Sequence, residues 1–278
     1  MSNPLISYMN INRVYCRLPS AGKFYNPNLI NCDAADEIPI KAMSARDEFQ
    51  LNNAQALMNG QAVAEVIQNC VPDIKDANFL NVCDVEVLLL GIKQASGDDT
   101  YSVPVECPEC TKKGEVTRDI TRLLDNLEIH PDKHTYKIND LELVLIPCTW
   151  KLYNIVGRSR FEQNKLIKTI TSPDFAGLSE EEKHEKINVA FNKLVDYTYD
   201  LMTGSVIHIT TPDGTVSDPA HIREYLQSLP KEHYTAINEK LAEINNMGVC
   251  KIETVVCTEC SHEWEESIDR FDPSAFFD

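Results

Sequence analysis

Two cysteine pairs of the form C-x-x-C are the part of this 278-residue sequence best suited to chemistry. They are Cys107-Pro-Glu-Cys110 and Cys257-Thr-Glu-Cys260, and each lies between β-prone segments. Two intervening residues let a tight turn direct both sulfurs of a pair at one cation, as in the knuckles of a zinc ribbon. Because four thiolates complete a tetrahedral shell, the sequence predicts one structural zinc site made by Cys107, Cys110, Cys257 and Cys260.

The distance between the two pairs is unusual for a zinc ribbon. Ordinary ribbons place their pairs within a few tens of residues, whereas these are separated by about 150 residues. The entropy cost of closing a loop rises only logarithmically with its length, so a long insertion between two halves of one ribbon is tolerated. We therefore expect a split ribbon interrupted by an inserted domain.

Three other interpretations of the cysteines stay open at this point. A redox pair would begin a helix after a strand, and neither pair precedes a convincing helix. Two independent metal sites could be completed by His262, Cys250, Cys148 or His134. The pairs could also be buried thiols, since free cysteine is a common core residue. The remaining cysteines are predicted to lie mostly in the core: Cys16, Cys32, Cys70, Cys83, Cys148 and Cys250.

The amino-acid composition limits the classes of partner that the chain can bind. The chain has 43 acidic and 26 basic residues, a net charge of -17, which repels a polyphosphate backbone, so nucleic acid is not expected as the main partner. The longest apolar run, at residues 85–90, is too short to span a bilayer, and the N-terminus lacks the pattern of a signal peptide. We therefore expect a cytoplasmic protein that is not associated with a membrane. In that compartment, close cysteine pairs serve as metal ligands and seldom form disulfides.

Hydrophobic periodicity and turn residues predict an α+β fold with four segments. Residues 1–43 are predicted as an extended arm, with one edge strand near its end, and 44–125 as a helical region carrying the first knuckle. Residues 126–248 are predicted as an inserted, mainly helical α+β domain, and 249–278 as the second knuckle with an aromatic tail. Within these segments, helices are expected at 46–58, 61–70, 84–95, 149–164, 179–202, 218–229 and 231–246.

No catalytic site is visible in the sequence. It contains no G-x-x-x-x-G-K-[ST], G-x-G-x-x-G, G-x-S-x-G or H-E-x-x-H pattern. Its seven histidines are scattered, and four thiolates around zinc would leave no open position for a substrate. We therefore predict that the protein is not an enzyme.

Three stretches together resemble the baseplate hub and hub-assembly proteins of T-even-like contractile-tailed bacteriophages. They are Leu18-Pro-Ser-Ala-Gly-Lys-Phe-Tyr25, the segment from Ile38 through Cys70-Val71, and Asp84–Ile92 followed by Tyr101 and the first knuckle. The C-terminal knuckle with its trailing Phe-Phe is similar to that family as well. The resemblance covers about residues 15–125 and 250–278.

The resemblance implies a structural or assembly component of a phage tail baseplate hub, without catalysis. Its implied partners are hub, spike or tape-measure proteins within an oligomeric assembly. Its implied location is the host cytoplasm during assembly and then the virion tail. The N-terminal arm and the tail Phe271–Phe277 are expected to dock on partners, since aromatic residues are favoured at interface cores. Two alternatives are an intracellular zinc-ribbon regulator that binds a protein and an enzyme with an unrecognised site.

Overall fold

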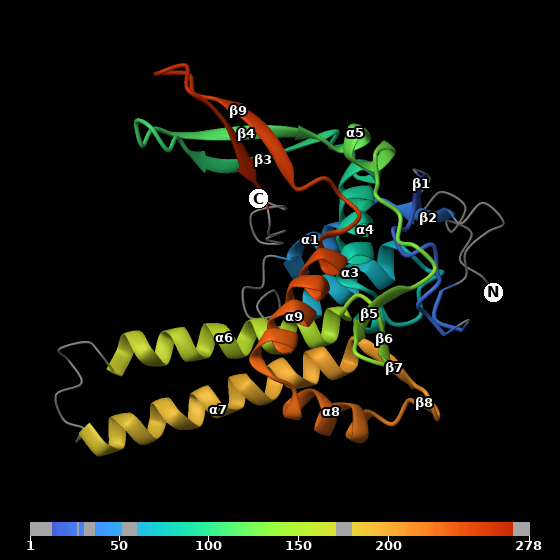
Figure 1. Cartoon of the computed structure of the whole chain (residues 1–278). Coiled ribbons are helices and arrows are strands. Elements are labelled where there is room, and N and C mark those ends of the chain that lie inside the picture. The colour runs from blue at the N-terminus through green and yellow to red at the C-terminus, as the bar shows by residue number, and fades with distance from the viewer. Residues whose placement is uncertain (1–12, 27, 31–36, 52–59, 171–179, 269–278) are drawn as a thin grey trace. The chain divides into compact units, whose positions relative to one another are not determined.

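The chain folds into helices and small antiparallel sheets, as the computed structural model in Figure 1 shows. The structure describes residues 13–26, 28–30, 37–51, 60–170 and 180–268. This confirms the predicted α+β class. The elements in chain order are β1 (Arg13–Arg17), β2 (Glu37–Lys41), α1 (Ala45–Leu51), α3 (Gln61–Cys70), η2 (Ala77–Phe79), α4 (Val82–Ala95), β3 (Thr100–Glu106), β4 (Lys113–Asp119), α5 (Ile120–Asp125), β5 (His134–Ile138), β6 (Leu141–Leu145), α6 (Trp150–Ile170), α7 (Glu180–Gly204), β7 (Val206–Thr211), β8 (Gly214–Val216), α8 (Pro219–Ser228), α9 (Lys231–Asn246), β9 (Ile252–Val256) and β10 (Glu263–Ser267).

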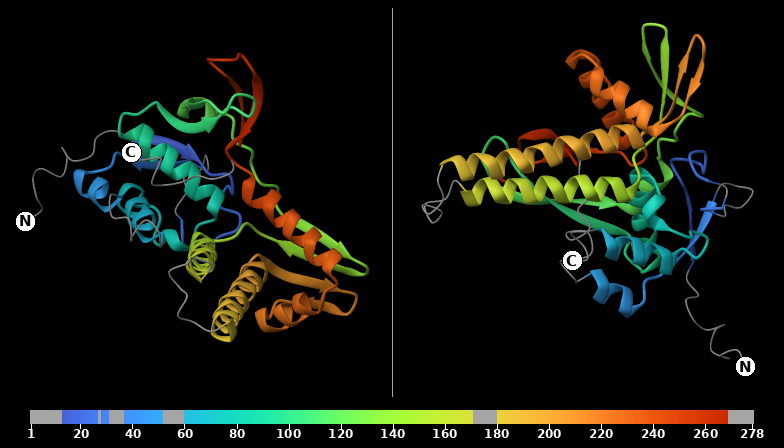
Figure 2. Two further views of the ribbon diagram at one scale, coloured as in Figure 1. Left: turned by 90° about the vertical axis from the view of Figure 1, so that its left-hand side faces the viewer. Right: turned by 90° about the horizontal axis from the view of Figure 1, so that it is seen from below.

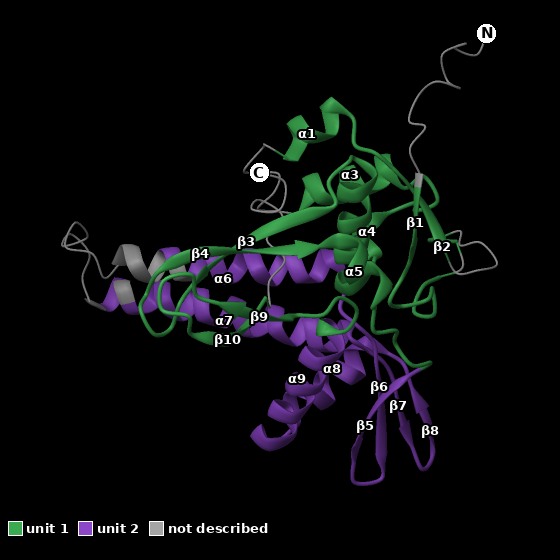
Figure 3. Ribbon diagram, turned by 90° about the horizontal axis from the view of Figure 1, so that it is seen from above, with its two compact units in different colours: residues 1–132, 246–278 green, residues 133–245 purple. Residues whose placement is uncertain are grey.

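These elements form two compact units, coloured separately in Figure 3. Unit 1 combines residues 1–132 with 246–278, and unit 2 comprises residues 133–245. The chain thus leaves unit 1 after the first cysteine pair and returns to it before the second. Both cysteine pairs therefore belong to the same unit.

Helix α4 forms the centre of unit 1. The sequence predicts it to be apolar nearly all round, and its described side chains are buried on every face, including those of Asp84 and Glu86. The antiparallel ribbon β1–β2 packs on α4, and the approach is closest at Gly91. A β-carbon at Gly91 would lie 2.5 Å from Ile40 Cδ1 and 2.6 Å from Cys16 Sγ. Glycine at this position therefore lets the ribbon reach the helix.

Replacing Gly91 with alanine should destabilise the protein by about 1–3 kcal/mol, because the added methyl group overpacks a full core. Helix propensity alone predicts the opposite sign, since alanine is favoured over glycine by about 1 kcal/mol in a helix. Gly157→Ala on α6 is the matched control, because nothing lies within 4 Å of its added β-carbon. Urea unfolding should show a loss for the first variant and a small gain for the second; a gain in both would contradict the close approach.

The N-terminal segment Leu18–Tyr25 is held on α4 by the buried carboxylate of Asp84. The backbone N–H of Ser20 donates to Asp84 Oδ1 at 2.9 Å, and the Ser20 hydroxyl donates to Oδ2. The Tyr25 hydroxyl also donates to Oδ2, at 2.5 Å, and accepts from the Asn81 N–H at 2.7 Å. The first of the stretches that carry the sequence resemblance is therefore held by a hydrogen-bonded clamp at the start of α4.

Unit 2 has its own core beneath a four-stranded antiparallel sheet of order β5-β6-β7-β8. Apolar side chains of β6 and β7 pack against α7, α8 and α9, with Met202, Leu226 and Ile237 fully buried. Arg223 on α8 forms ion pairs with Asp196 and Asp200 on α7. Helices α6 and α7 form a long antiparallel hairpin that extends beyond the sheet, as the right-hand view in Figure 2 shows.

Several elements differ from the sequence-based predictions. The arm predicted for residues 1–43 contains a strand, β1, that the sequence did not predict, and it pairs with the predicted edge strand β2. Helix α6 continues to Ile170 instead of ending near residue 164, and α5 was not predicted. Ser44 caps α1, since its hydroxyl accepts the Asp47 N–H at 3.4 Å and its own N–H donates to Asp47 Oδ2 at 2.8 Å. Ser179, where the helix predicted at 179–202 begins, lies outside the described residues, and α7 is described from Glu180.

Candidate metal centre

Each cysteine pair lies at the tip of a two-stranded antiparallel hairpin in unit 1. Strands β3 and β4 pair from Thr100–Asp119 to Glu106–Lys113, and the first pair occupies the turn beyond them. Strands β9 and β10 pair from Ile252–Ser267 to Val256–Glu263, and the second pair occupies the corresponding turn. A strand, not a helix, follows each pair, which is the arrangement expected of a zinc knuckle and not of a thioredoxin-like redox pair.

The two turns have the same backbone geometry. In the first, the N–H of Cys107 donates to Lys112 O at 2.9 Å, and the N–H of Thr111 donates to Cys107 O at 2.9 Å. Thr111 and its counterpart Ser261 both have φ 58°, in the left-handed region that tight turns use. The matching bonds of the second turn join Cys257 N to His262 O at 2.8 Å and Ser261 N to Cys257 O at 3.0 Å.

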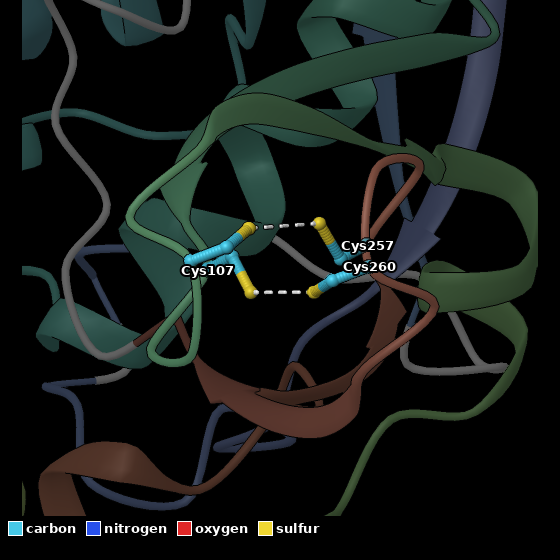
Figure 4. A group of neighbouring side chains, drawn as sticks. Cys107, Cys257 and Cys260 are labelled. Atoms are coloured by element: carbon cyan, nitrogen blue, oxygen red, sulfur yellow. Dashed lines mark hydrogen bonds between the residues drawn. The ribbon is translucent and has the colours of Figure 1, made fainter.

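The two turns bring four sulfur atoms together. All four Sγ atoms lie within 4.8 Å of one another. The cross-hairpin distances are 3.7 Å between Cys107 and Cys260 and 3.6 Å between Cys110 and Cys257, drawn as dashed lines in Figure 4. A zinc ion bound by four thiolates at about 2.3 Å would set its sulfurs about 3.8 Å apart. The cluster therefore has the dimensions of a tetrahedral four-cysteine shell.

The electrostatics of the cluster stabilise one ionised thiol and disfavour the ionisation of further thiols. Backbone N–H groups of Cys260 and Glu259 donate to the Cys257 sulfur and lower its pKa to about 6. At Cys260 the N–H of His262 also lowers the pKa, but desolvation and the neighbouring thiols Cys110, Cys257 and Cys107 outweigh it and raise the pKa to about 12. Four thiolates this close repel one another, so full ionisation requires a cation among them.

Arg118 on β4 joins the second hairpin to the first. Its side chain is 2% exposed, and its guanidinium donates to three partners on different segments. Nε pairs with Glu253 Oε1 at 3.1 Å, Nη1 donates to the Tyr101 hydroxyl at 2.9 Å, and Nη2 donates to Cys250 O at 2.5 Å. Because arginine offers a planar fork of donors, one buried side chain fixes β9 against both strands of the first hairpin.

Two lysines complete this connection. Lys251, just before β9, forms an ion pair with the buried Glu86 of α4. At the tips, Lys112 of the first turn pairs with Glu259 of the second at 3.1 Å, an exposed contact of little energetic weight. Nothing in the sequence marked Arg118, Lys251 or Glu86 as more than ordinary charges, because their partners lie more than 100 residues away.

Comparison with known proteins identifies the chain. A family model described as T4 bacteriophage base plate protein matches residues 10–278, nearly the whole length of the sequence. The chain belongs to this family. No curated protein and no solved structure matches it.

Membership in the base plate family implies that the chain interacts with other phage tail proteins and belongs to the virion tail. It favours a structural role over a catalytic one. In the described residues, no helix is long and apolar enough to cross a membrane. The match extends through the inserted unit 2, for which the sequence offered no resemblance.

The base plate chain does not use the alternative ligands considered from sequence within its cysteine cluster. In the described part of the chain, the side chains that lie close enough together to hold one metal ion are these four cysteines alone. Cys250 is exposed, contrary to its predicted burial, and its thiol donates to Ile252 O at 3.4 Å. His262 stacks on Trp264 with ring centroids 6.1 Å apart, whereas Cys148 and His134 belong to unit 2.

One cysteine–histidine contact lies outside the cluster. Cys83 Sγ lies 3.2 Å from His130 Nε2, a separation that could suit a nucleophile and its base. Their side chains, however, are 0% and 1% exposed, and the His130 backbone N–H donates to Pro19 O at 2.9 Å. A substrate cannot reach them, so the contact packs the core of unit 1.

The other predicted core cysteines that the structure describes are also buried: Cys16, Cys70 and Cys148. Burial raises the pKa of each thiol to about 12. Cys32 lies outside the described residues.

Proposed function

We propose that this protein is a structural or assembly component of the baseplate hub in a contractile phage tail, stabilised by one zinc ion. The proposed ligands are Cys107, Cys110, Cys257 and Cys260. The observation that carries the zinc proposal is the separation of the four sulfur atoms, all within 4.8 Å of one another. Such a closed shell binds no substrate, so the proposed role of the metal is to hold the fold together and not to catalyse a reaction.

The position of the ligands in the chain supports a structural role for the metal. Two ligands precede unit 2 in sequence and two follow it, so the ion would join the two chain segments that make unit 1. Metal binding at such a site adds its free energy to folding, because the unfolded chain lacks the preformed shell.

Partner docking is assigned to the arm at residues 1–43 and to the tail Phe271–Phe277. Residues 1–12, 27, 31–36 and 269–278 lie outside the described residues, so these assignments rest on sequence and family resemblance. The proposed partners are hub, spike and tape-measure proteins, met first in the host cytoplasm. The alternatives are a zinc-ribbon regulator, which would bind a host protein instead, and an enzyme with an unrecognised site.

Metal content and assembly test the proposal together. The purified protein should contain one zinc per chain, and X-ray absorption should show four sulfur neighbours at about 2.3 Å. Nitrogen or oxygen neighbours, or a metal-free folded protein, would contradict the four-cysteine site. Expressed with the other tail proteins of its phage, the chain should co-purify with hub components; co-purification with host proteins alone would favour the regulator.

A further inference from the structure

The α6–α7 hairpin of unit 2 carries many of the large hydrophobic side chains that the described chain exposes. Of the large hydrophobic side chains exposed in the described residues, half lie on these two helices. A two-helix hairpin can bury only the facing stripe of each helix, so these residues lack a covering layer. The exposed residues are Tyr153, Ile155, Phe161, Val189, Phe191 and Val195.

The two helices carry opposite charges. Helix α6 has five lysines or arginines and one glutamate, although the whole chain has a net charge of -17. Helix α7 has six acidic residues and three lysines. Two of those acids pair with Arg223 of α8, which leaves the remaining four in the first turns of α7, toward the end of the hairpin. The basic helix and the acidic end of its neighbour thus offer complementary surfaces on one chain.

On α6 the exposed ring of Phe161 lies between two cations. Arg158, Phe161 and Lys165 follow one another at spacings of three and four, so they project from one side of the helix. All three are exposed, and Phe161 is 51% exposed. We call these three residues the Phe161 ridge. Arg158 also pairs with Glu162 along the helix at 3.3 Å, but both side chains are mostly exposed, so this weak surface pair offsets only part of the charge at that end of the ridge.

Between α6 and α7 lies a groove of about 660 Å³. Its apolar lining comes from Val189 and Ala190, and small or polar residues of α6, Ser159 and Gln163, complete it. Its charged lining contains three glutamates, Glu162, Glu182 and Glu185, and two lysines, Lys186 and Lys193. The groove can therefore receive an apolar side chain flanked by cations, which is the composition of the Phe161 ridge.

We infer that the hairpin is a self-association surface in which the Phe161 ridge of one copy packs into the α6–α7 groove of a second copy. Ridge and groove are different surfaces, so the contact is heterologous, and successive copies close into a ring or form an open array. The contact involves a few helical turns and belongs to the small, weak class of interfaces. It forms at high protein concentration or within an assembly that holds the copies close.

The first test measures the mass of the full-length protein by sedimentation over a concentration series. The average mass should rise above the 31.4 kDa of one chain at concentrations of about 10–100 µM, as expected for a weak contact. Phe161→Glu should raise the dissociation constant at least about tenfold, because it buries a charge beside acids. Phe79→Glu on η2 is the matched control, since Phe79 is also 51% exposed, and it should associate as the wild type does.

Reversing the charges of the ridge or of the groove tests whether a second copy of the chain occupies the groove. A chain with Arg158→Glu and Lys165→Glu should not associate with itself, and neither should a chain with Glu182→Lys and Glu185→Lys. A mixture of the two should associate again, because each reversed ridge meets a complementary groove. A monomeric wild type throughout the series, an unaffected Phe161→Glu, or a mixture that stays monomeric would overturn the inference. Circular dichroism confirms that each variant is folded.

Discussion

Replacing Cys257 with serine should release the metal and destabilise unit 1 by several kcal/mol. Serine offers no thiolate, and the three remaining sulfurs leave the shell open to water. The Cys257 sulfur accepts the backbone N–H groups of Cys260 and Glu259 and lies 3.6 Å from the Cys110 sulfur, so its loss removes a ligand that the turn holds in place. The zinc content should fall below about 0.2 per chain after gel filtration if affinity drops at least a hundredfold.

Calorimetry should show which of the two units loses stability in the Cys257→Ser variant. Unit 2 has its own core and contains none of the four cysteines, so its unfolding transition should stay in place while that of unit 1 moves down by about 10 °C or more. A chelator applied to the wild type should produce the same shift. Cys250→Ser is the matched control, because Cys250 is exposed and lies outside the cluster. If Cys250→Ser and Cys257→Ser melt alike, the single split site is wrong.

The zinc hypothesis shows which features a sequence can reveal. The C-x-x-C spacing and the flanking β-prone residues are local, and the structure brings the predicted four sulfurs together. Zinc itself and the four-segment domain division stay predictions. The contacts that fix the two hairpins to each other, through Arg118 and through Lys251, involve residues whose local sequence is unremarkable. Only the folded chain shows that Arg118 has three partners from separate segments.

Some element boundaries were predicted wrongly because they, too, depend on contacts with distant segments. The helix was predicted to end near residue 164 because residues 165–178, with Ser172-Pro-Asp, are typical of a linker; α6 instead runs to Ile170 beside α7. Pairing with a second long helix stabilises residues whose own pattern is ambiguous. Strand β1 was missed because its partner β2 lies about 20 residues later, and a lone five-residue strand has little signal. The central position of α4, by contrast, followed directly from its apolar residues.

Replacing Asp84 with alanine should cost roughly 3–6 kcal/mol, since it leaves three buried donors without an acceptor at about 1–3 kcal/mol each. Those donors are the N–H and hydroxyl of Ser20 and the hydroxyl of Tyr25. Burial raises the pKa of Asp84, and the hydrogen bonds from Ser20 and Tyr25 oppose that rise, so the carboxylate is costly to bury and depends on these partners. Thermal unfolding measures the loss.

A graded series separates the hydrogen bonds from the charge. Asp84→Asn keeps an acceptor for the Ser20 N–H and removes the buried charge, so it should cost less than about half as much as alanine. Tyr25→Phe removes one donor and leaves the Asn81 N–H unpaired, and it should cost about 1–2 kcal/mol. If all three variants unfold within about 0.5 kcal/mol of the wild type, Asp84 does not anchor the Leu18–Tyr25 segment.

A loss in the predicted order would give the Leu18–Tyr25 motif a physical meaning in this base plate protein. Asp84 follows Asn81 by less than one helical turn, so the clamp fixes the N-terminal segment at the start of α4, where Cys83 also meets His130. The Lys23 ammonium in turn donates a hydrogen bond to the backbone carbonyl oxygen of His130 at 3.2 Å. The segment therefore links the core helix to the chain just before unit 2, and weakening it should also lower the stability of the metal-bearing unit even though no ligand is touched.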